Sequence, residues 1–188
     1  MSVVVTVKKK SQIVIASDTQ ANFGNMKVSA RHLVNHKKIY GVADSFIGIV
    51  GWQAIGQVVE HLIHKKPEIF GLNSRMQIFD TLLELQGLLK QDYYIETEED
   101  KEQPVESNQI TALVANRSGI FEIDTYREVQ EFNDYTAIGS GNKYALGAMH
   151  ALYDLDFSAA EIAKAGIHAA AEYDDGCSLP LMIETFDL

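Results

Sequence analysis

The chain is poor in cysteine, basic residues and long apolar segments, and each shortage excludes a class of protein. A single cysteine, Cys177, excludes an internal disulfide framework and is typical of a reducing compartment, so we expect a cytoplasmic protein. The 16 Lys and Arg are outnumbered by 26 Asp and Glu, which gives a formal charge of -10 and argues against nucleic acid as a partner. No apolar run approaches the roughly 20 residues that span a bilayer, so no membrane association is expected.

The remaining composition is that of an ordinary folded domain. Of the 188 residues, 46% are hydrophobic and 22% are charged, which is enough apolar surface for a full core. The chain carries no repeat of 20–50 residues and no low-complexity tract. We therefore expect a single domain over residues 1–188.

Apolar periodicity divides the chain into blocks of strands and pairs of helices. Strands are expected at residues 2–7, 12–17, 38–43, 46–50, 109–115, 120–124, up to about 132, 135–138 and 179–186. Apolar residues recur at helical spacing in four segments, which predicts four helices. These segments run from Trp52 to Pro67, from the N-cap candidate Ser74, from residue 141, and from the capping box of Ser158 and Glu161. The acidic residues 96–107 are expected to form an exposed loop. This order favours an α+β fold with sheets packed face to face between helix layers.

Ser2 is a candidate nucleophile. A small residue after Met1 normally permits removal of that methionine, and Ser2 would then carry its own α-amine beside its hydroxyl. An α-amine has an unperturbed pKa of about 8, so its neutral form can serve as the base for the neighbouring side chain. Taken alone, Met-Ser is an ordinary way for a chain to begin.

Three further residues lie at ends of expected strands, each with a structural and a functional interpretation. Asp18 ends the second strand, where it can orient a cation or simply form an Asx turn. Lys38 opens a strand, either as a solvated edge residue or as a buried ammonium that lowers the pKa of a hydroxyl. Gly51 precedes a helix, where its N–H can stabilise an oxyanion or merely form a turn.

The later segments offer weaker candidates. Gly139-Ser140-Gly141 lies between a strand and a helix, but it lacks the lysine and the spacing of a phosphate-binding loop. The paired histidines at positions 32 and 36, and at 61 and 64, lack the pattern of a metal site, and the first pair falls where we expect a strand. Cys177 has no basic neighbour in sequence and is interpreted as a packed residue. We expect no cofactor and no metal.

Together, these pieces resemble the proteasome β-subunit family, including the HslV peptidases, within the N-terminal nucleophile (Ntn) hydrolases. Ser2 and Asp18 have the spacing of that family's nucleophile and aspartate, and Lys38-Ile39 is similar to its lysine-aliphatic pair. The most specific piece is the run from Ala137 to Gly141, which resembles the family's G-S-G step before a helix. The segment from Asp175 to Ser178 is similar to its D-x-x-S turn.

The resemblance implies a four-layer α-β-β-α sandwich, the Ntn-hydrolase fold, with two mainly antiparallel sheets between the helix layers. It implies a peptidase subunit of a self-compartmentalised, stacked ring that acts on peptide and protein substrates with an ATP-dependent unfoldase as a partner. The resemblance also implies a role for each candidate residue. Ser2 is the nucleophile, Lys38 lowers the pKa of its hydroxyl, and Asp18 keeps Lys38 charged. The Gly51 N–H stabilises the oxyanion, and the α-amine receives hydrogen bonds that adjust its basicity from Ser140, Asp175 and Ser178.

Two alternatives remain open at the level of sequence. The path from Asp18 to Lys38 is about four residues longer than in typical members of the family, so Lys37 or Arg31 could fill the lysine's role. If Met1 is retained, the α-amine base is blocked, and the chain is then a non-catalytic structural subunit of a proteasome-like ring. A serine where the family mostly has threonine also predicts slower turnover, because the methyl group that restricts χ1 is missing.

Overall fold

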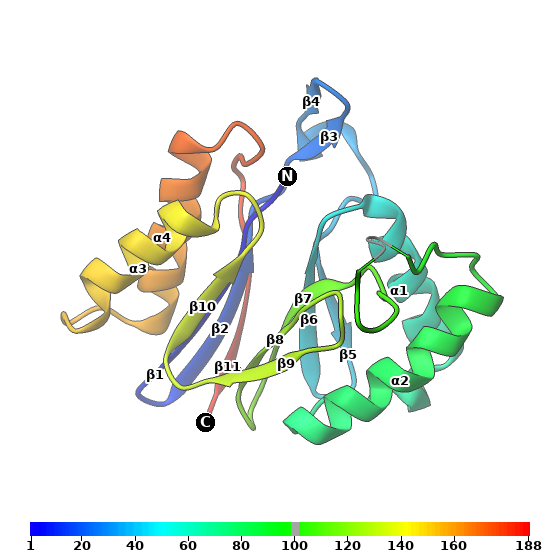
Figure 1. Ribbon diagram of the computed structural model, residues 1–188. Helices are drawn as coiled ribbons and strands as arrows, with labels where there is room; N and C mark the ends of the chain where they lie inside the picture. The colour runs from blue at the N-terminus through cyan, green and yellow to red at the C-terminus, as the bar shows by residue number, and fades with distance from the viewer. Residues whose placement is uncertain (99–101) are drawn as a thin grey trace.

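Two antiparallel sheets stack face to face at the centre of the molecule, with a pair of helices on each outer side (Figure 1). The computed structural model describes residues 1–98 and 102–188. The first sheet has the order β10 (Tyr135–Ile138), β1 (Val4–Lys9), β2 (Gln12–Ser17) and β11 (Met182–Asp187). The second has the order β5 (Ile39–Val42), β6 (Ser45–Val50), β7 (Thr111–Asn116), β8 (Ile120–Ile123) and β9 (Val129–Phe132). The predicted four-layer arrangement is confirmed.

The helix pairs cover the outer faces of the two sheets. α1 (Gln53–Lys65) and α2 (Arg75–Gln91) lie on the second sheet, and α3 (Asn142–Tyr153) and α4 (Ala159–Tyr173) lie on the first (Figure 1). Ser74 caps α2, where its hydroxyl accepts a hydrogen bond from the Gln77 N–H, and Ser158 with Glu161 forms the predicted capping box of α4. The cap signals in the sequence therefore located both helix starts.

Three apolar clusters separate the four layers. Val3, Val5 and Val7 pack with α3 and α4, whereas Val4 between them faces the second sheet, so both faces of β1 are covered. This explains why the strand is apolar without alternation. The sheets approach closely at Gly48, where a Cβ would lie only 2.6 Å from the Val4 side chain. A third cluster fills the space between the second sheet and the helices α1 and α2.

The structure differs from the sequence interpretation mainly between β2 and β5. A small hairpin, β3 (Ala21–Phe23) with β4 (Met26–Val28), and a 3₁₀ turn, η1 (Ala30–His32), occupy this stretch. The expected strand over residues 32–36 is wrong, because His32 ends η1 and His36 lies in a loop. Strands of three residues are too short to show a period. A second 3₁₀ turn, η2 (Pro67–Ile69), follows α1 and begins at the proline that ends that helix.

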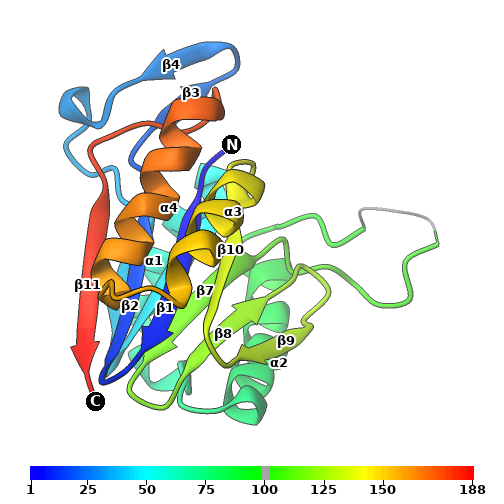
Figure 2. The same ribbon diagram turned by 90° about the vertical axis from the view of Figure 1, so that its left-hand side faces the viewer.

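The acidic segment 96–107 is only partly the free loop that its composition predicted. Residues 99–101 of that prediction lie outside the described residues, and the described remainder contains no helix or strand and runs out to one side of the molecule (Figure 2). Its two ends are tied together, because the Ser107 N–H donates to the Thr97 carbonyl at 2.9 Å and both residues are buried. Glu106 also pairs with Lys90 of α2. No described helix has the length and apolar character needed to cross a membrane.

Candidate active site

Ser2 lies at the head of β1, at the end of the first sheet where the chain enters the fold (Figure 1). The residue is 6% exposed. Its backbone N–H donates to Ser140 Oγ at 3.1 Å, and its carbonyl accepts from the Gly141 N–H at 3.3 Å. Its hydroxyl donates to the carbonyl of Met1, which is joined to Ser2 by a peptide bond. The β10–α3 turn therefore holds Ser2 by its backbone and leaves its hydroxyl to other partners.

Gly139 explains why this turn requires glycine. Its φ is +95°, and a Cβ at this position would lie 2.2 Å from the Ser2 carbonyl oxygen. A side chain here would therefore be strained by its own backbone and would also displace Ser2. The Gly-Ser-Gly sequence is thus a close-approach motif around Ser2, and no phosphate-binding role is needed to explain it.

Asp18 is fully buried and is saturated with hydrogen bonds. Its Oδ1 accepts from the Val3 N–H at 2.9 Å and from Lys38 Nζ at 2.6 Å. Its Oδ2 accepts from the Gln20 N–H at 2.9 Å and from the Ser178 N–H at 3.2 Å. Four donors match the four lone-pair positions of an ionised carboxylate, so Asp18 is held as an anion that fixes three chain segments around it.

Lys38 is the basic residue that the structure brings to Asp18. Its side chain is 7% exposed and its ammonium lies against the carboxylate, immediately before β5. Lys37 points elsewhere, because its ammonium pairs with Glu60 at 2.6 Å and lies over the ring of Tyr40. Arg31 is exposed on η1. The geometry therefore favours Lys38 among the three basic residues considered from the sequence.

Gly51 follows β6 and comes just before α1, as the sequence pattern indicated. Its φ is +101°, a backbone conformation that side-chain-bearing residues rarely adopt, and its position is on the wall of the cavity beside Ser2. Trp52 forms the N-cap of α1 without a side-chain hydrogen bond, and Gln53 and Ala54 of the first turn line the same cavity.

The turn after α4 contacts the site through atoms other than those that its D-x-x-S motif suggested. Ser140 Oγ donates to Asp174 Oδ1 at 3.0 Å, and the same oxygen accepts from the Gly176 N–H at 2.9 Å. Asp174 was missed in the sequence. Asp175 contacts the site through its backbone carbonyl, which accepts from Gln20 at 2.8 Å. Ser178 contributes its N–H to Asp18 and its carbonyl to Thr19. The only sequence signal for Asp174 is its place directly after the last turn of α4.

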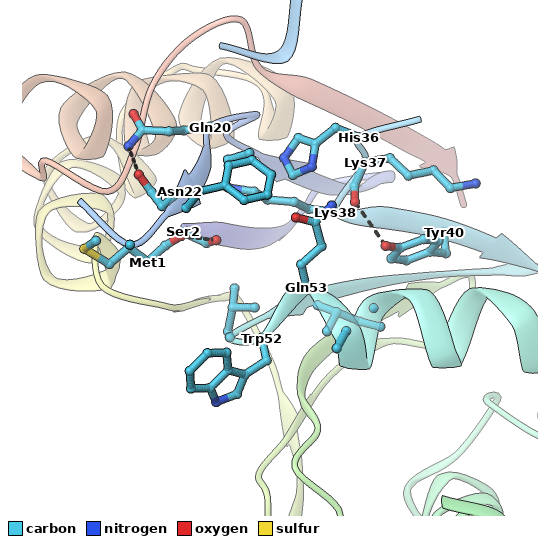
Figure 3. A pocket seen from close by; sticks show the side chains of 18 residues that line it. Met1, Ser2, Gln20, Asn22, His36, Lys37, Lys38, Tyr40, Trp52 and Gln53 are labelled. Carbon is cyan, nitrogen blue, oxygen red and sulfur yellow. Dashed lines mark hydrogen bonds between the residues drawn. The ribbon is translucent and has the colours of Figure 1, made fainter. Parts of the chain in front are cut away.

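A cavity of about 620 Å³ opens beside Ser2 (Figure 3). Its walls are Met1 and Ser2, residues 20–24, residues 36–38, Tyr40, residues 49–54 and Gly56. Figure 3 shows the side chains of His36 and Gln53 directed toward the cavity from opposite walls. Apart from Ser2, Lys38 and Gly51, and Lys37 as the alternative to Lys38, these residues were not predicted as site residues, because they come from separate segments of the chain that share no pattern in the sequence.

Burial shapes the titration of groups around the cavity. Burial first, and then the nearby Lys38 charge, lower the pKa of His36, while the Gln20 backbone and the Asp18 carboxylate oppose this shift. Burial and the Glu60 carboxylate raise the pKa of Tyr40 to about 12. Both groups are therefore neutral near pH 7. Cys177 is 1% exposed, and burial raises the pKa of its thiol, which agrees with a packed role.

The described residues contain no cluster of three or more His, Cys, Asp or Glu side chains arranged to hold a metal ion. The chemistry available at this site is instead a hydroxyl, a buried Lys–Asp ion pair, a serine hydroxyl beside the backbone nitrogen of Ser2, and a glycine N–H near a helix start. These are the components of acyl transfer to a nucleophilic hydroxyl.

The fold and this arrangement define an Ntn-hydrolase-type chain, and comparison with known proteins identifies the family. The sequence profile described as "Proteasome subunit" matches residues 2–179, so the chain belongs to the proteasome subunit family. It is 30% identical over 177 residues to the ATP-dependent protease subunit HslV of Rickettsia prowazekii, covering 90% of this chain and 86% of that protein.

Solved structures give the same result. The Thiobacillus denitrificans protein named BPH matches with 37% identity and a TM-score of 0.92, covering 99% of this chain and 98% of that one. A second structure of that protein, described as a complex with epoxomicin, matches with 36% identity, a TM-score of 0.90 and the same coverage. The HslV of Trypanosoma brucei matches with 20% identity and a TM-score of 0.76 over 99% of both chains, which shows a shared fold.

Proposed function

We propose that this chain is a peptidase subunit of a self-compartmentalised ring, with Ser2 as its nucleophile after removal of Met1. The observation that carries the proposal is the convergence of three elements at one end of the first sheet. The Ser2 backbone is held by Ser140, the Lys38–Asp18 ion pair lies in the same buried region, and a cavity large enough for substrate side chains opens beside them.

Release of Met1 changes the chemistry of Ser2. The nitrogen that now donates to Ser140 becomes a primary amine, with an ordinary pKa of about 8, which in its neutral form can accept the proton of the Ser2 hydroxyl. Ser140 and its partner Asp174 then orient that amine. The Lys38 ammonium favours the developing alkoxide, and Asp18 fixes the ammonium in place.

The reaction follows from these positions. Ser2 Oγ attacks the scissile carbonyl, its proton passes to the α-amine, and the oxyanion is stabilised by the Gly51 N–H at the start of α1. Collapse expels the substrate's amine, which takes the proton from the α-ammonium and leaves an acyl ester on Ser2. Water, deprotonated by the same α-amine, then hydrolyses the ester and restores the hydroxyl. The turn that contains Asp175 and Ser178 contacts Gln20 and Asp18. We propose that these two residues help to hold the amine in position through that turn.

Enclosure is part of the proposal. A small domain with an exposed nucleophile would be an indiscriminate peptidase, whereas a closed ring of identical subunits admits only unfolded chains. An ATP-dependent unfoldase is the partner that would supply such chains, and HslV of Rickettsia prowazekii, a relative, is described as a subunit of an ATP-dependent protease. A reducing compartment such as the cytoplasm suits a chain whose single cysteine is buried.

The test begins with the intact mass of the purified protein, which reports whether Met1 is gone. The processed protein should hydrolyse fluorogenic peptides, and it should gain the mass of epoxomicin, the compound present in the Thiobacillus denitrificans complex. Ser2→Ala should abolish both while leaving assembly, measured by light scattering, unchanged. Ser2→Thr is the matched control and should turn over faster, because its methyl restricts χ1. Wild-type hydrolysis by Ser2→Ala would refute the assignment.

A second candidate function is a non-catalytic structural subunit of such a ring. The observation that favours it is the hydrogen bond from the Ser2 hydroxyl to the Met1 carbonyl, which engages the nucleophile as long as Met1 is attached. In that case the purified protein retains the mass of Met1, assembles, and neither hydrolyses peptides nor reacts with epoxomicin. The mass measurement thus separates the two candidates before any variant is made.

A further inference from the structure

The β3–β4 hairpin and the turn that follows it have no core of their own. Residues 23–35, here called the arm, are all described by the structure, and none of them is buried. The hairpin forms a separate two-stranded sheet, and two short strands are at best marginally stable alone in water. The arm nevertheless exposes 52% of Phe23, 60% of Met26 and 97% of Val34. The described residues of the chain leave these apolar side chains uncovered, which is typical of an interaction surface.

The charge of this region sets it apart from the rest of the chain. Residues 19–43 contain four of the 16 Lys and Arg of the sequence and none of its 26 Asp and Glu. Lys37 and Lys38 are paired with carboxylates, whereas Lys27 and Arg31 are exposed and form no ion pair with the described residues. The arm is therefore apolar and cationic on a chain whose formal charge is -10. Electrostatic complementarity requires a partner surface that is rich in carboxylates.

The opposite charge is concentrated in another part of the chain. Residues 92–134 contain 12 of the 26 Asp and Glu but only three of the 16 Lys and Arg. On and beside β9, four of these carboxylates are exposed and form what we call the acidic flank: Asp124, Glu128, Glu131 and Asp134. Two bordering arginines, Arg75 and Arg127, each donate to a backbone carbonyl and are outnumbered by these carboxylates. The flank therefore keeps a net negative charge.

The acidic flank also offers a place for an apolar side chain. A cavity of about 300 Å³ lies beside Glu128, and Met76, Phe79 and Val129 form its apolar wall. Met76 is 61% exposed, so this wall is open to solvent. An apolar hollow bordered by carboxylates is complementary to the arm, which carries apolar side chains next to cations.

A second copy of this chain is the partner that fits both surfaces. Figure 2 shows the hairpin and β9 on opposite sides of the molecule, so one chain cannot cover its own arm with its own flank. A lipid surface fits poorly, because two unpaired cations attract it weakly while the formal charge of -10 opposes the approach. Contact between the arm of one copy and the flank of the next is heterologous, and a heterologous contact generates a ring when the rotation closes.

We propose that the arm of each copy docks on the acidic flank of the next copy. Lys27 and Arg31 then face the carboxylates of the flank, and an apolar side chain of the arm enters the hollow beside Glu128. This inference rests on the proposed function, because it names the two surfaces through which the proposed ring closes. Phe23 and Gly24 also line the cavity beside Ser2, so a copy seated on the arm borders the proposed active site.

The test reverses the charges of the two surfaces and follows assembly by light scattering in a dilution series. Lys27→Glu with Arg31→Glu places like charges opposite one another, so the concentration of half-assembly should rise at least about tenfold above that of the wild type. Glu128→Lys with Glu131→Lys should have the same effect. The variant with all four changes again has opposite charges at every contact, and its half-assembly concentration should return to within about threefold of the wild-type value.

Two further variants separate the apolar contact from a general effect of charge. Met26→Ser with Val34→Ser keeps all charges but removes apolar area, and it should also raise the half-assembly concentration about tenfold. Lys65→Glu with Lys66→Glu is the matched control, because both side chains are exposed at the end of α1 and the net charge changes equally. This control should leave assembly unchanged. Far-UV circular dichroism should be the same for all variants, because every replaced side chain is exposed.

The outcomes distinguish the interface from the proposed function. If the wild type assembles and the charge-reversed variants assemble equally well, the interface is refuted while the ring stands. The interface also fails if the variant with all four changes stays dissociated, or if the Lys65 and Lys66 control dissociates to the same extent. A wild type that is monomeric at every concentration refutes both the ring and the interface.

A lipid partner would give a different result. Wild-type protein would bind vesicles of anionic phospholipid, and Lys27→Glu with Arg31→Glu would abolish that binding without changing assembly, which would overturn the proposal. Peptide hydrolysis is not the readout of these experiments, so a failure of Ser2 as the nucleophile would leave their result unaffected.

Discussion

Replacing Asp18 by Asn tests the ion pair on which the site is built. The change preserves the shape of the side chain but removes the charge that faces Lys38 and places an amide NH₂ where donors already converge. The side chains of Lys38 and Asp18 are 7% and 0% exposed, so the unpaired ammonium cannot be solvated in place. Breaking a buried ion pair of this kind costs about 3–5 kcal/mol, and we expect about 4 kcal/mol of unfolding free energy to be lost.

Lys38→Met should be milder. It removes one charge-assisted hydrogen bond, worth about 2 kcal/mol, but leaves Asp18 with its three backbone donors. In the double variant no unpaired ammonium remains, so its loss should fall below that of Asp18→Asn alone, and the coupling energy between the sites should exceed about 2 kcal/mol. Both single variants should also lose peptidase activity, because the ammonium is either misplaced or absent.

The measurement is urea unfolding followed by far-UV circular dichroism at one fixed protein concentration, since assembly would add to the apparent stability. Asp156→Asn is the matched control, because this carboxylate pairs with Lys10 at 3.1 Å on the surface, with its side chain 97% exposed, and its loss should leave the midpoint unchanged. A loss below about 1 kcal/mol for Asp18→Asn, or additive single variants, would refute the reasoning.

Three other predictions follow from the same geometry. Gly139→Ala should cost about 2 kcal/mol or more and abolish activity, because its φ is +95° and its Cβ would collide with the Ser2 carbonyl, whereas Gly147→Ala, with open space around it, should be tolerated in the same urea assay. Because the pKa of His36 is lowered from 6.5, the unfolded chain takes up more protons as the pH falls through that value. The unfolding free energy should therefore decrease on acidification below pH 6.5, and His36→Leu should remove this part of the slope. Cys177 should react with a thiol reagent in urea but hardly at all in the native protein, and rapid native labelling would contradict its burial.

The sequence predicted the layers of the fold better than the walls of the cavity. Strands such as β10, and helices that begin at Ser74 and Ser158, follow from apolar periods and cap residues, which are local signals. The hairpin of β3 and β4, whose two strands pair with each other, was missed because three residues cannot express a period.

Within the site, the residues at ends of strands were the predictable ones. Asp18, Lys38 and Gly51 lie where a strand begins or ends, and their positions could be read from the pattern. His36 and Asp174 could not, because each acts through neighbours that are remote in sequence, and an isolated histidine or a second aspartate in a turn carries no periodic signal. Asp175 contacts the site through its backbone carbonyl. This contact could not be predicted either, because it depends on the path of the backbone and not on the type of side chain.

The Ser2 end of the first sheet is assembled from segments that lie far apart in the polypeptide. Ser2 is held by Ser140, 138 positions away, and the turn beyond β2 is closed by Pro180, 161 positions from Thr19. During synthesis these partners leave the ribosome late, and contacts of such separation are slow to form. The emerging chain therefore carries its proposed nucleophile early but acquires a competent site only when nearly all of the fold has been made. For the peptidase proposed above, this late assembly would keep the site inactive while neighbouring nascent proteins are still unfolded.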